Sequence, residues 1–172
     1  MQKTAIVNMF FLLIVIGGIR AAAASESPNV DAPFAVGQWI GGVERDQHGH
    51  FIDCTAHSTA ADSQSGVALA VLANANLWLT LYDSSWHFGK QPIQIRLRAG
   101  AYDLGLRTTE PPNGSVLDIN LGSDRTVALA LSSGENLEAF IGPDRKMFSI
   151  QDGGKAILAL ADCAQSRVGR PN

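Results

Sequence analysis

Short apolar segments separated by turn residues follow one another along this chain, and their length restricts the fold more than any other feature. In residues 93–98 the order IQIRLR alternates apolar with polar side chains. A period of two is typical of a β-strand with one buried face. Comparable segments recur, among them residues 77–82 and 116–121. The pattern predicts a mainly β fold, an antiparallel β-sandwich or barrel-like domain.

A helix is expected to close this domain. Residues 155–164 (KAILALADCA) place apolar side chains at helical spacing and are rich in Ala and Leu, which are strong helix formers. The sequence therefore predicts a C-terminal α-helix packed on the strands. Residues 123–133 fit two structures. A cap at Asp124 favours a short helix, whereas the alternating apolar residues after it also suit a strand.

The N-terminal residues have the three parts of a secretory signal. Lys3 provides a positive charge, residues 5–19 form an apolar run, and residues 21–24 are alanines followed by a polar stretch. We expect cleavage after Ala24. The apolar run is shorter than the roughly 20 residues of a membrane-spanning helix, and an uncleaved N-terminal anchor is the alternative.

The expected organisation is a cleavable signal peptide at 1–24, a flexible lead-in at 25–33, a single β-rich domain at 34–165 and a flexible tail at 166–172. The expected location is periplasmic or secreted, with no stable membrane span after cleavage.

Charge narrows the range of partners. The signal contains two of the 13 basic residues, Lys3 and Arg20, and none of the 16 acidic ones, so the mature chain has 11 basic residues and a net charge of −5. These charges are scattered along the chain. The balance argues against a nucleic-acid partner or attraction to anionic lipid. No motif for a cofactor is recognisable, and none is predicted.

Cys54 and Cys163 are the only cysteines. In an oxidising compartment an even number of cysteines indicates disulfide pairing, and the sequence predicts a bridge between these two. Closing so long a loop stabilises a protein by about 4 to 5 kcal/mol in the chain-entropy model. Two buried free thiols are the alternative.

One cluster of ionisable residues suggests chemistry: His48, His50, Asp53 and His57. Alternate residues of a strand point to the same side, so His48 and His50 could share a metal. Zinc sites usually need three or four convergent ligands, and an exposed hairpin tip is the favoured interpretation. No G-x-S-x-G nucleophile motif is present. A small exported hydrolase or metalloenzyme using this region is the alternative function, and it requires the four side chains to converge.

Aromatic residues suggest a ligand groove, with four candidates: Trp39, Trp78, Tyr82 and Trp86. Trp78 and Tyr82 share one face of a predicted strand. Core packing is the alternative, because aromatic side chains dominate small β cores through their area. On another strand Arg96 and Arg98 share a face. They could bind an anion, and a solvated strand face is the alternative.

Motifs spread over residues 38–163 match a known pattern: a strand with Trp39, Phe51-x-x-Cys54, a Trp78/Trp86 segment leading to Gly89 and Pro92, Phe148-x-Ile150, Gly154 and the helix of 156–160. Together they resemble the invasion-associated locus B family of small exported alphaproteobacterial proteins. The resemblance implies an exported β-rich domain with a short helix and no known enzymatic activity, and some members are linked to host-cell colonisation. The favoured function is therefore an exported, non-enzymatic binding or envelope-accessory module with a protein or glycan partner.

Overall fold

The computed structural model describes residues 31–60 and 64–167. The predicted signal peptide lies outside the described residues, as do most of the predicted lead-in and tail. The first strand begins at Asp31, inside the predicted lead-in. The elements, in order, are β1 (Asp31–Val36), β2 (Trp39–Arg45), β3 (Phe51–Ser58), β4 (Ser65–Leu72), β5 (Leu77–Asp83), β6 (Ile93–Ala99), β7 (Tyr102–Thr109), β8 (Val116–Gly122), α1 (Arg125–Ser133), β9 (Asn136–Ile141), β10 (Asp144–Ser149) and α2 (Gly153–Arg167).

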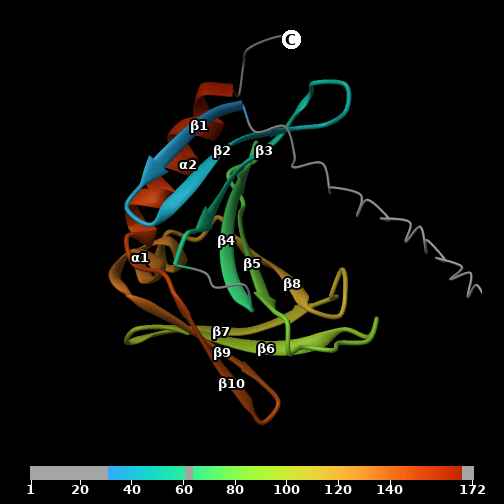
Figure 1. Ribbon diagram of the computed structural model, residues 1–172. Helices are drawn as coiled ribbons and strands as arrows, with labels where there is room; N and C mark the ends of the chain where they lie inside the picture. Colours follow the sequence, from blue (N-terminus) through green and yellow to red (C-terminus); the bar gives the residue numbers. More distant parts are fainter. Residues whose placement is uncertain (1–30, 61–63, 168–172) are drawn as a thin grey trace, which may run out of the picture.

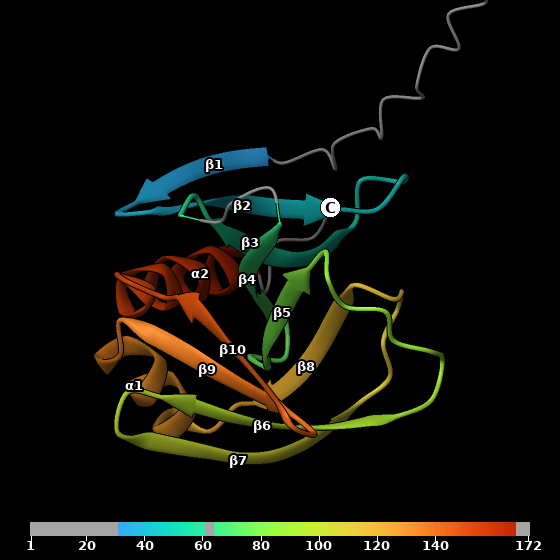
Figure 2. The ribbon, with the colours of Figure 1, turned by 60° about the horizontal axis from the view of Figure 1, so that its bottom comes forward.

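The strands form two antiparallel sheets (Figure 1). One has six strands in the order β1-β2-β3-β4-β5-β8, and the other has four in the order β10-β9-β6-β7. Both sheets end in open edges, so neither closes into a barrel. The mainly β, sandwich-like fold with a C-terminal helix is thus confirmed. The strands of the four-stranded sheet run across the ends of β4 and β5 (Figures 1 and 2).

Alternation along each strand explains how one core forms between the layers. In β4 and β5 every second residue is buried, and the same holds for the middle of β6. Leu69 and Leu79 are cross-strand partners on the inner face, and Leu79 also pairs with Ile119 of β8. All three are at most 2% exposed. They fix the register, because a slip by one residue would turn these side chains to the outer face of the sheet.

Helix α2 covers the inner face of the six-stranded sheet at β2, β3 and β4 and also packs on α1 (Figure 2). Its buried side is made of small and apolar residues, among them Ala156, Leu160 and Ala164. The predicted disulfide is present: Cys54 of β3 bonds to Cys163 of α2, with a Cα–Cα distance of 6.1 Å. This bond ties the last helix to the sheet on which it packs.

The ambiguous segment before β9 is helix α1, as favoured from the sequence. Asp124 caps it, since its Oδ1 accepts a hydrogen bond of 2.8 Å from the backbone N–H of Thr126. Val127, Ala130 and Leu131 point into the core. Leu129 lies on the other side of the helix and is exposed. The apolar residues that alternate in the sequence are therefore divided between a buried face and an exposed face of one helix.

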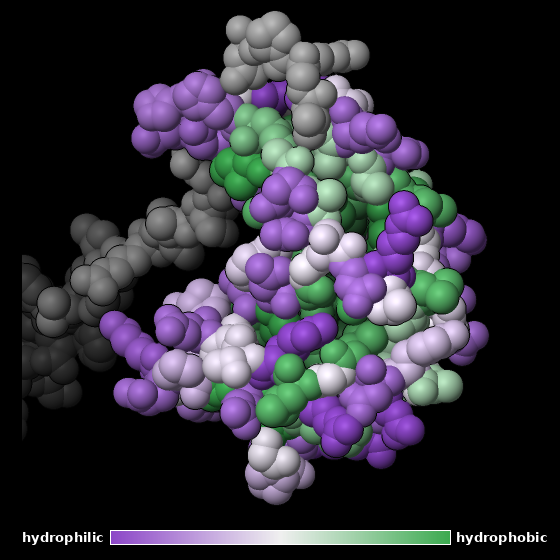
Figure 3. Space-filling model, turned by 180° about the vertical axis from the view of Figure 1, so that it is seen from behind, coloured by the Kyte–Doolittle hydropathy of each residue, from purple (hydrophilic) through white to green (hydrophobic). Residues whose placement is uncertain are grey.

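Apolar side chains also reach the surface in patches between hydrophilic ones, and the molecule is hollowed at one side when seen from behind (Figure 3). Among the described residues, neither helix has the length and apolar character that crossing a membrane requires.

Candidate functional site

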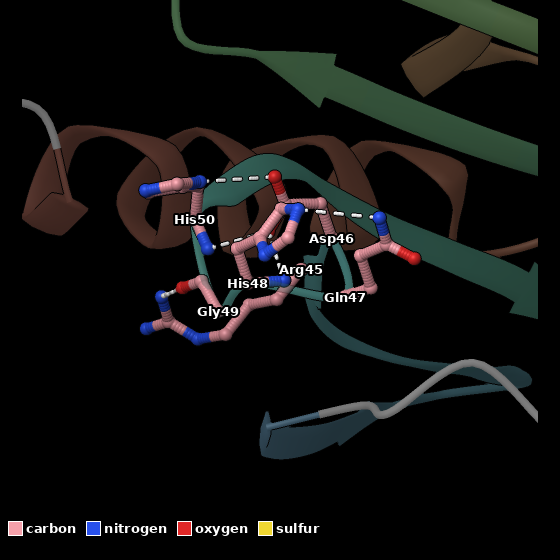
Figure 4. Close-up of polar contacts among 6 residues, drawn as sticks. All are labelled: Arg45, Asp46, Gln47, His48, Gly49 and His50. Carbon is pink, nitrogen blue, oxygen red and sulfur yellow. Dashed lines mark hydrogen bonds and ion pairs between the residues drawn. The ribbon is translucent and has the colours of Figure 1, made fainter.

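In the histidine-containing hairpin between β2 and β3, the polar groups form hydrogen bonds with one another (Figure 4). Asp46 Oδ1 accepts hydrogen bonds of 2.8 Å from the backbone N–H groups of His48 and His50, and Asp46 Oδ2 lies 3.0 Å from His50 Nδ1. Arg45 donates to the carbonyl of Gly49 at 2.7 Å. The contact with the His50 ring is the main reason that the pKa of Asp46 lies below its usual value. These bonds are typical of a turn stabilised by Asp.

The four residues of the proposed catalytic cluster do not converge. His48 and His50 lie at the exposed tip, whereas Asp53 and His57 lie farther along β3, and His57 is exposed. Within residues 31–60 and 64–167 no group of three or more His, Cys, Asp or Glu side chains is placed to hold a metal ion. The geometry gives no support to the hydrolase or metalloenzyme alternative, because that function required these side chains to meet.

Asp53 is nevertheless in an unusual environment. It is half-buried on β3, directly across from Glu44 of β2 in the sheet register. Its Oδ1 is buried and has no hydrogen-bond partner among the described residues. Burial, and next to it the negative charge of Glu44, raise the pKa of Asp53 to about 6. Burial and a neighbouring negative charge both disfavour the charged form of Asp53, and none of the hollows described below is lined by this residue.

Two of the four predicted groove aromatics belong to the core. Trp39 is fully buried, and its Nε1 donates a 2.8 Å hydrogen bond to the carbonyl of Gln151 at the start of α2. Trp86 is 7% exposed and packs against Phe88 and Phe148, with ring centroids 5.2 and 5.9 Å away. Both tryptophans are packing residues of the core, so they do not line an open groove.

The other two aromatics, Trp78 and Tyr82, lie on the outward face of β5, with Thr80 between them. This face is half-buried, and Thr80 Oγ1 donates a 2.7 Å hydrogen bond to Asp118 on β8. Trp78 Nε1 is buried without a hydrogen-bond partner among the described residues. The structure thus brings Trp78 and Tyr82 to one face and separates them from Trp39 and Trp86.

An apolar hollow lies where the two helices meet the six-stranded sheet. Its volume is about 420 Å³. Walls come from the β4–β5 turn, the β8–α1 junction and facing sides of the helices, including Leu72, Leu77, Ala128, Ile157 and Ala161. Apolar lining with few polar groups is typical of ligand pockets of this size.

A second, more open hollow of about 730 Å³ continues along the two helices. The two hollows share Arg125, Ala128 and Ile157. The second one adds Leu129, which is 57% exposed, and Leu158, which is 68% exposed. We call the two hollows together, with these five residues at their centre, the helix seam.

The helix seam was missed in the sequence because its walls come from segments far apart in the chain. The only available signal was weak: Leu129 and Leu158 fall outside the buried stripes of their helices. A single exposed leucine is ordinary on a protein surface, so it carried no prediction.

These features define a small, disulfide-bonded antiparallel β domain with apolar hollows along its helices. Its fold is similar to that in the crystal structure of invasion associated protein B from Bartonella henselae, with a TM-score of 0.55 and 15% sequence identity over 78% of this chain and 97% of that one. No family model matches the chain, and no curated protein does. The resemblance inferred from the sequence is therefore supported at the level of the fold.

Proposed function

We propose that this chain is an exported, non-enzymatic binding module of the bacterial periplasm or exterior, and that it binds a protein partner at the helix seam. The observation that carries this proposal is the continuity between an apolar pocket and two exposed leucines. Contiguous exposed apolar surface on a small domain is typical of protein interaction sites. The disulfide and the apolar run at the N-terminus support export.

A protein partner suits the helix seam better than a glycan. Sugar hydroxyl groups need hydrogen-bond partners when they leave water, and the pocket walls are mainly apolar. Of the polar groups that line the pocket, Asp124 already caps α1. Apolar side chains of a protein segment would fill the pocket, and polar side chains of the same segment would meet Arg125, Ser132 and Lys155 along the second hollow. The fold shared with an invasion-associated protein supports testing host-surface proteins beside envelope proteins.

Site-directed photo-cross-linking tests this proposal. A photoreactive phenylalanine analogue at position 158 should give a discrete protein adduct in bacterial envelope or host-cell fractions, whereas the same analogue at position 48 should not. Ala161→Phe places a large ring in the pocket from an exposed position of α2, and we expect it to abolish the adduct without lowering the melting temperature. An adduct that forms equally from both positions, or that survives Ala161→Phe, would falsify the proposed site.

A further inference from the structure

The outward face of the four-stranded sheet carries a second set of exposed side chains. Cross-strand partners share a face, and the register places two rows of residues there, each running over all four strands. The first row, in the order β10, β9, β6, β7, is Met147, Glu138, Arg98 and Asp103. The second row, in the same order, is Arg145, Phe140, Arg96 and Leu106. We call these eight residues the arginine face.

Charges on the arginine face are only partly paired. Arg96 donates to Asp103 through Nε and Nη2, and Arg145 donates to Glu138. Arg98 forms no hydrogen bond or ion pair among the described residues, although its charge lies close enough to Asp103 to lower the pKa of that carboxyl alongside the stronger effect of Arg96. Three arginines against two acids leave this face positive, while the chain as a whole has a net charge of −3.

The face is also apolar in places and hollowed. Met147 is 59% exposed and Leu106 is 57% exposed, and a hollow of about 430 Å³ is lined by Arg96, Arg98, Asp103 and Phe140. Arg, Met and aromatic residues are enriched in protein interfaces, whereas Lys is depleted, and the eight positions contain no Lys. Met147 and Leu106 lie on the two edge strands of this sheet, so they add exposed apolar area at both edges of the arginine face.

We propose that the arginine face is a second binding surface, specific for an acidic segment of a protein partner. A carboxylate of the partner would accept hydrogen bonds from Arg98 and from the donors that Arg96 does not use on Asp103, and an apolar side chain would pack beside Phe140. Arg98, which has no ion-pair partner among the described residues, favours an acidic partner through charge complementarity. The arginine face shares no residue with the helix seam, so it stands on its own observations.

Fluorescence anisotropy with a short labelled peptide of alternating Glu and Leu tests this proposal. The full mature protein should bind the peptide at low salt and release it as salt rises. Arg98→Glu should weaken binding about tenfold or more, the loss expected for one charge-assisted hydrogen bond. Lys90→Glu, the same charge change in the exposed loop before β6, should leave binding nearly unchanged, as should Leu158→Asp in the helix seam.

Any of three results with the peptides would overturn it: equal binding by Arg98→Glu and wild type, no binding by the wild type, or equal binding of a peptide with Gln in place of Glu. Binding of a sulfated polysaccharide through Arg98, without binding of the acidic peptide, would also contradict it, since the site would then recognise a glycan. Loss of photo-cross-linking at position 158 with intact peptide binding would reject the helix seam alone.

Discussion

Asp53 is the residue whose environment departs most from the ordinary one. It is half-buried beside Leu72 and Glu44 in the sheet register, and one of its oxygens lacks a hydrogen bond among the described residues. Its pKa of about 6 in the folded chain exceeds the value near 3.9 of an unfolded chain. Between these two values the folded protein binds more protons than the unfolded one, so stability must fall as pH rises through this window.

Asp53→Asn should remove this pH dependence. The variant should be more stable than the wild type above pH 6, by on the order of 1 kcal/mol once the partial exposure of the carboxyl is taken into account. Below about pH 4 the two proteins should be equally stable, because Asp53 is then neutral in both states. Urea unfolding at a series of pH values measures the difference.

Glu44→Gln is the matched control for this prediction. It removes the neighbouring charge but not the burial, which is the larger cause of the shift. The pKa of Asp53, followed by NMR titration, should therefore move part of the way toward its ordinary value and stay above it. A normal pKa for Asp53 in the wild type would contradict the whole account.

The tryptophans show what a sequence can and cannot predict for single residues. The strand positions of Trp39 and Trp78 were predictable, and so was the shared face of Trp78 and Tyr82, whereas Trp86 lies after the end of β5. Whether a tryptophan faced a core or a groove was not, because burial depends on which element covers it. Trp39 is hydrogen-bonded to Gln151, which precedes α2 and lies more than a hundred positions away in the chain.

Among the elements, α2 is the one that the Cys54–Cys163 disulfide ties to a distant strand, β3. The C-terminal helix was predictable because its composition and its spacing agree, and the disulfide was predictable because only two cysteines exist. Helix α1 was harder, since nine residues with alternating apolar side chains satisfy both periods. The cap at Asp124 is a local signal that distinguishes the two structures, and the buried stripe of α1 agrees with it.

Cys54→Ser should destabilise the docking of α2. In the oxidised wild type the disulfide lowers the conformational entropy of the unfolded chain. Its loss should lower the free energy of unfolding by about 4 to 5 kcal/mol in the chain-entropy model. Without the bond, Cys163 is a half-buried thiol near the end of α2, where a helix frays most easily. We expect a lower melting temperature under non-reducing conditions and labelling of Cys163 by a thiol reagent. The double variant with Cys163→Ser should melt like the single one, and an unchanged melt in the single variant would mean that the bond does not form in solution.

At the scale of the whole molecule, the pairing of strands into two sheets could not be predicted. Strand positions follow from local pattern, but β8 returns to pair with β5, and β9 pairs with β6. Those choices depend on cross-strand packing between distant segments. The helix seam and the arginine face both result from this arrangement, which explains why the sequence indicated the arginines of β6 but not the residues around them.

One ion pair links the two sheets. Lys146 of β10 lies 2.8 Å from Asp83 at the end of β5, and it also donates to the Ser85 hydroxyl at 3.0 Å. Asp83 is 6% exposed and accepts a further hydrogen bond from the backbone N–H of Ser85. Burial opposes ionisation of Asp83, but the bonds from Lys146 and Ser85 outweigh it and hold the pKa of Asp83 below its usual value.

Lys146→Met should therefore destabilise the molecule by more than the loss of a surface ion pair, because it leaves a buried carboxylate without its cation. We expect a loss of about 1 to 2 kcal/mol after allowing for the partial exposure of Lys146. A depressed pKa contributes stability above the unfolded value, so the deficit of the variant should be full at neutral pH and shrink as pH falls below about 4. Arg145→Met, which removes the exposed pair with Glu138 within one sheet, should cost at most about 1 kcal/mol. Equal losses in the two variants at neutral pH would show that the link between the sheets contributes no more than an ordinary surface pair.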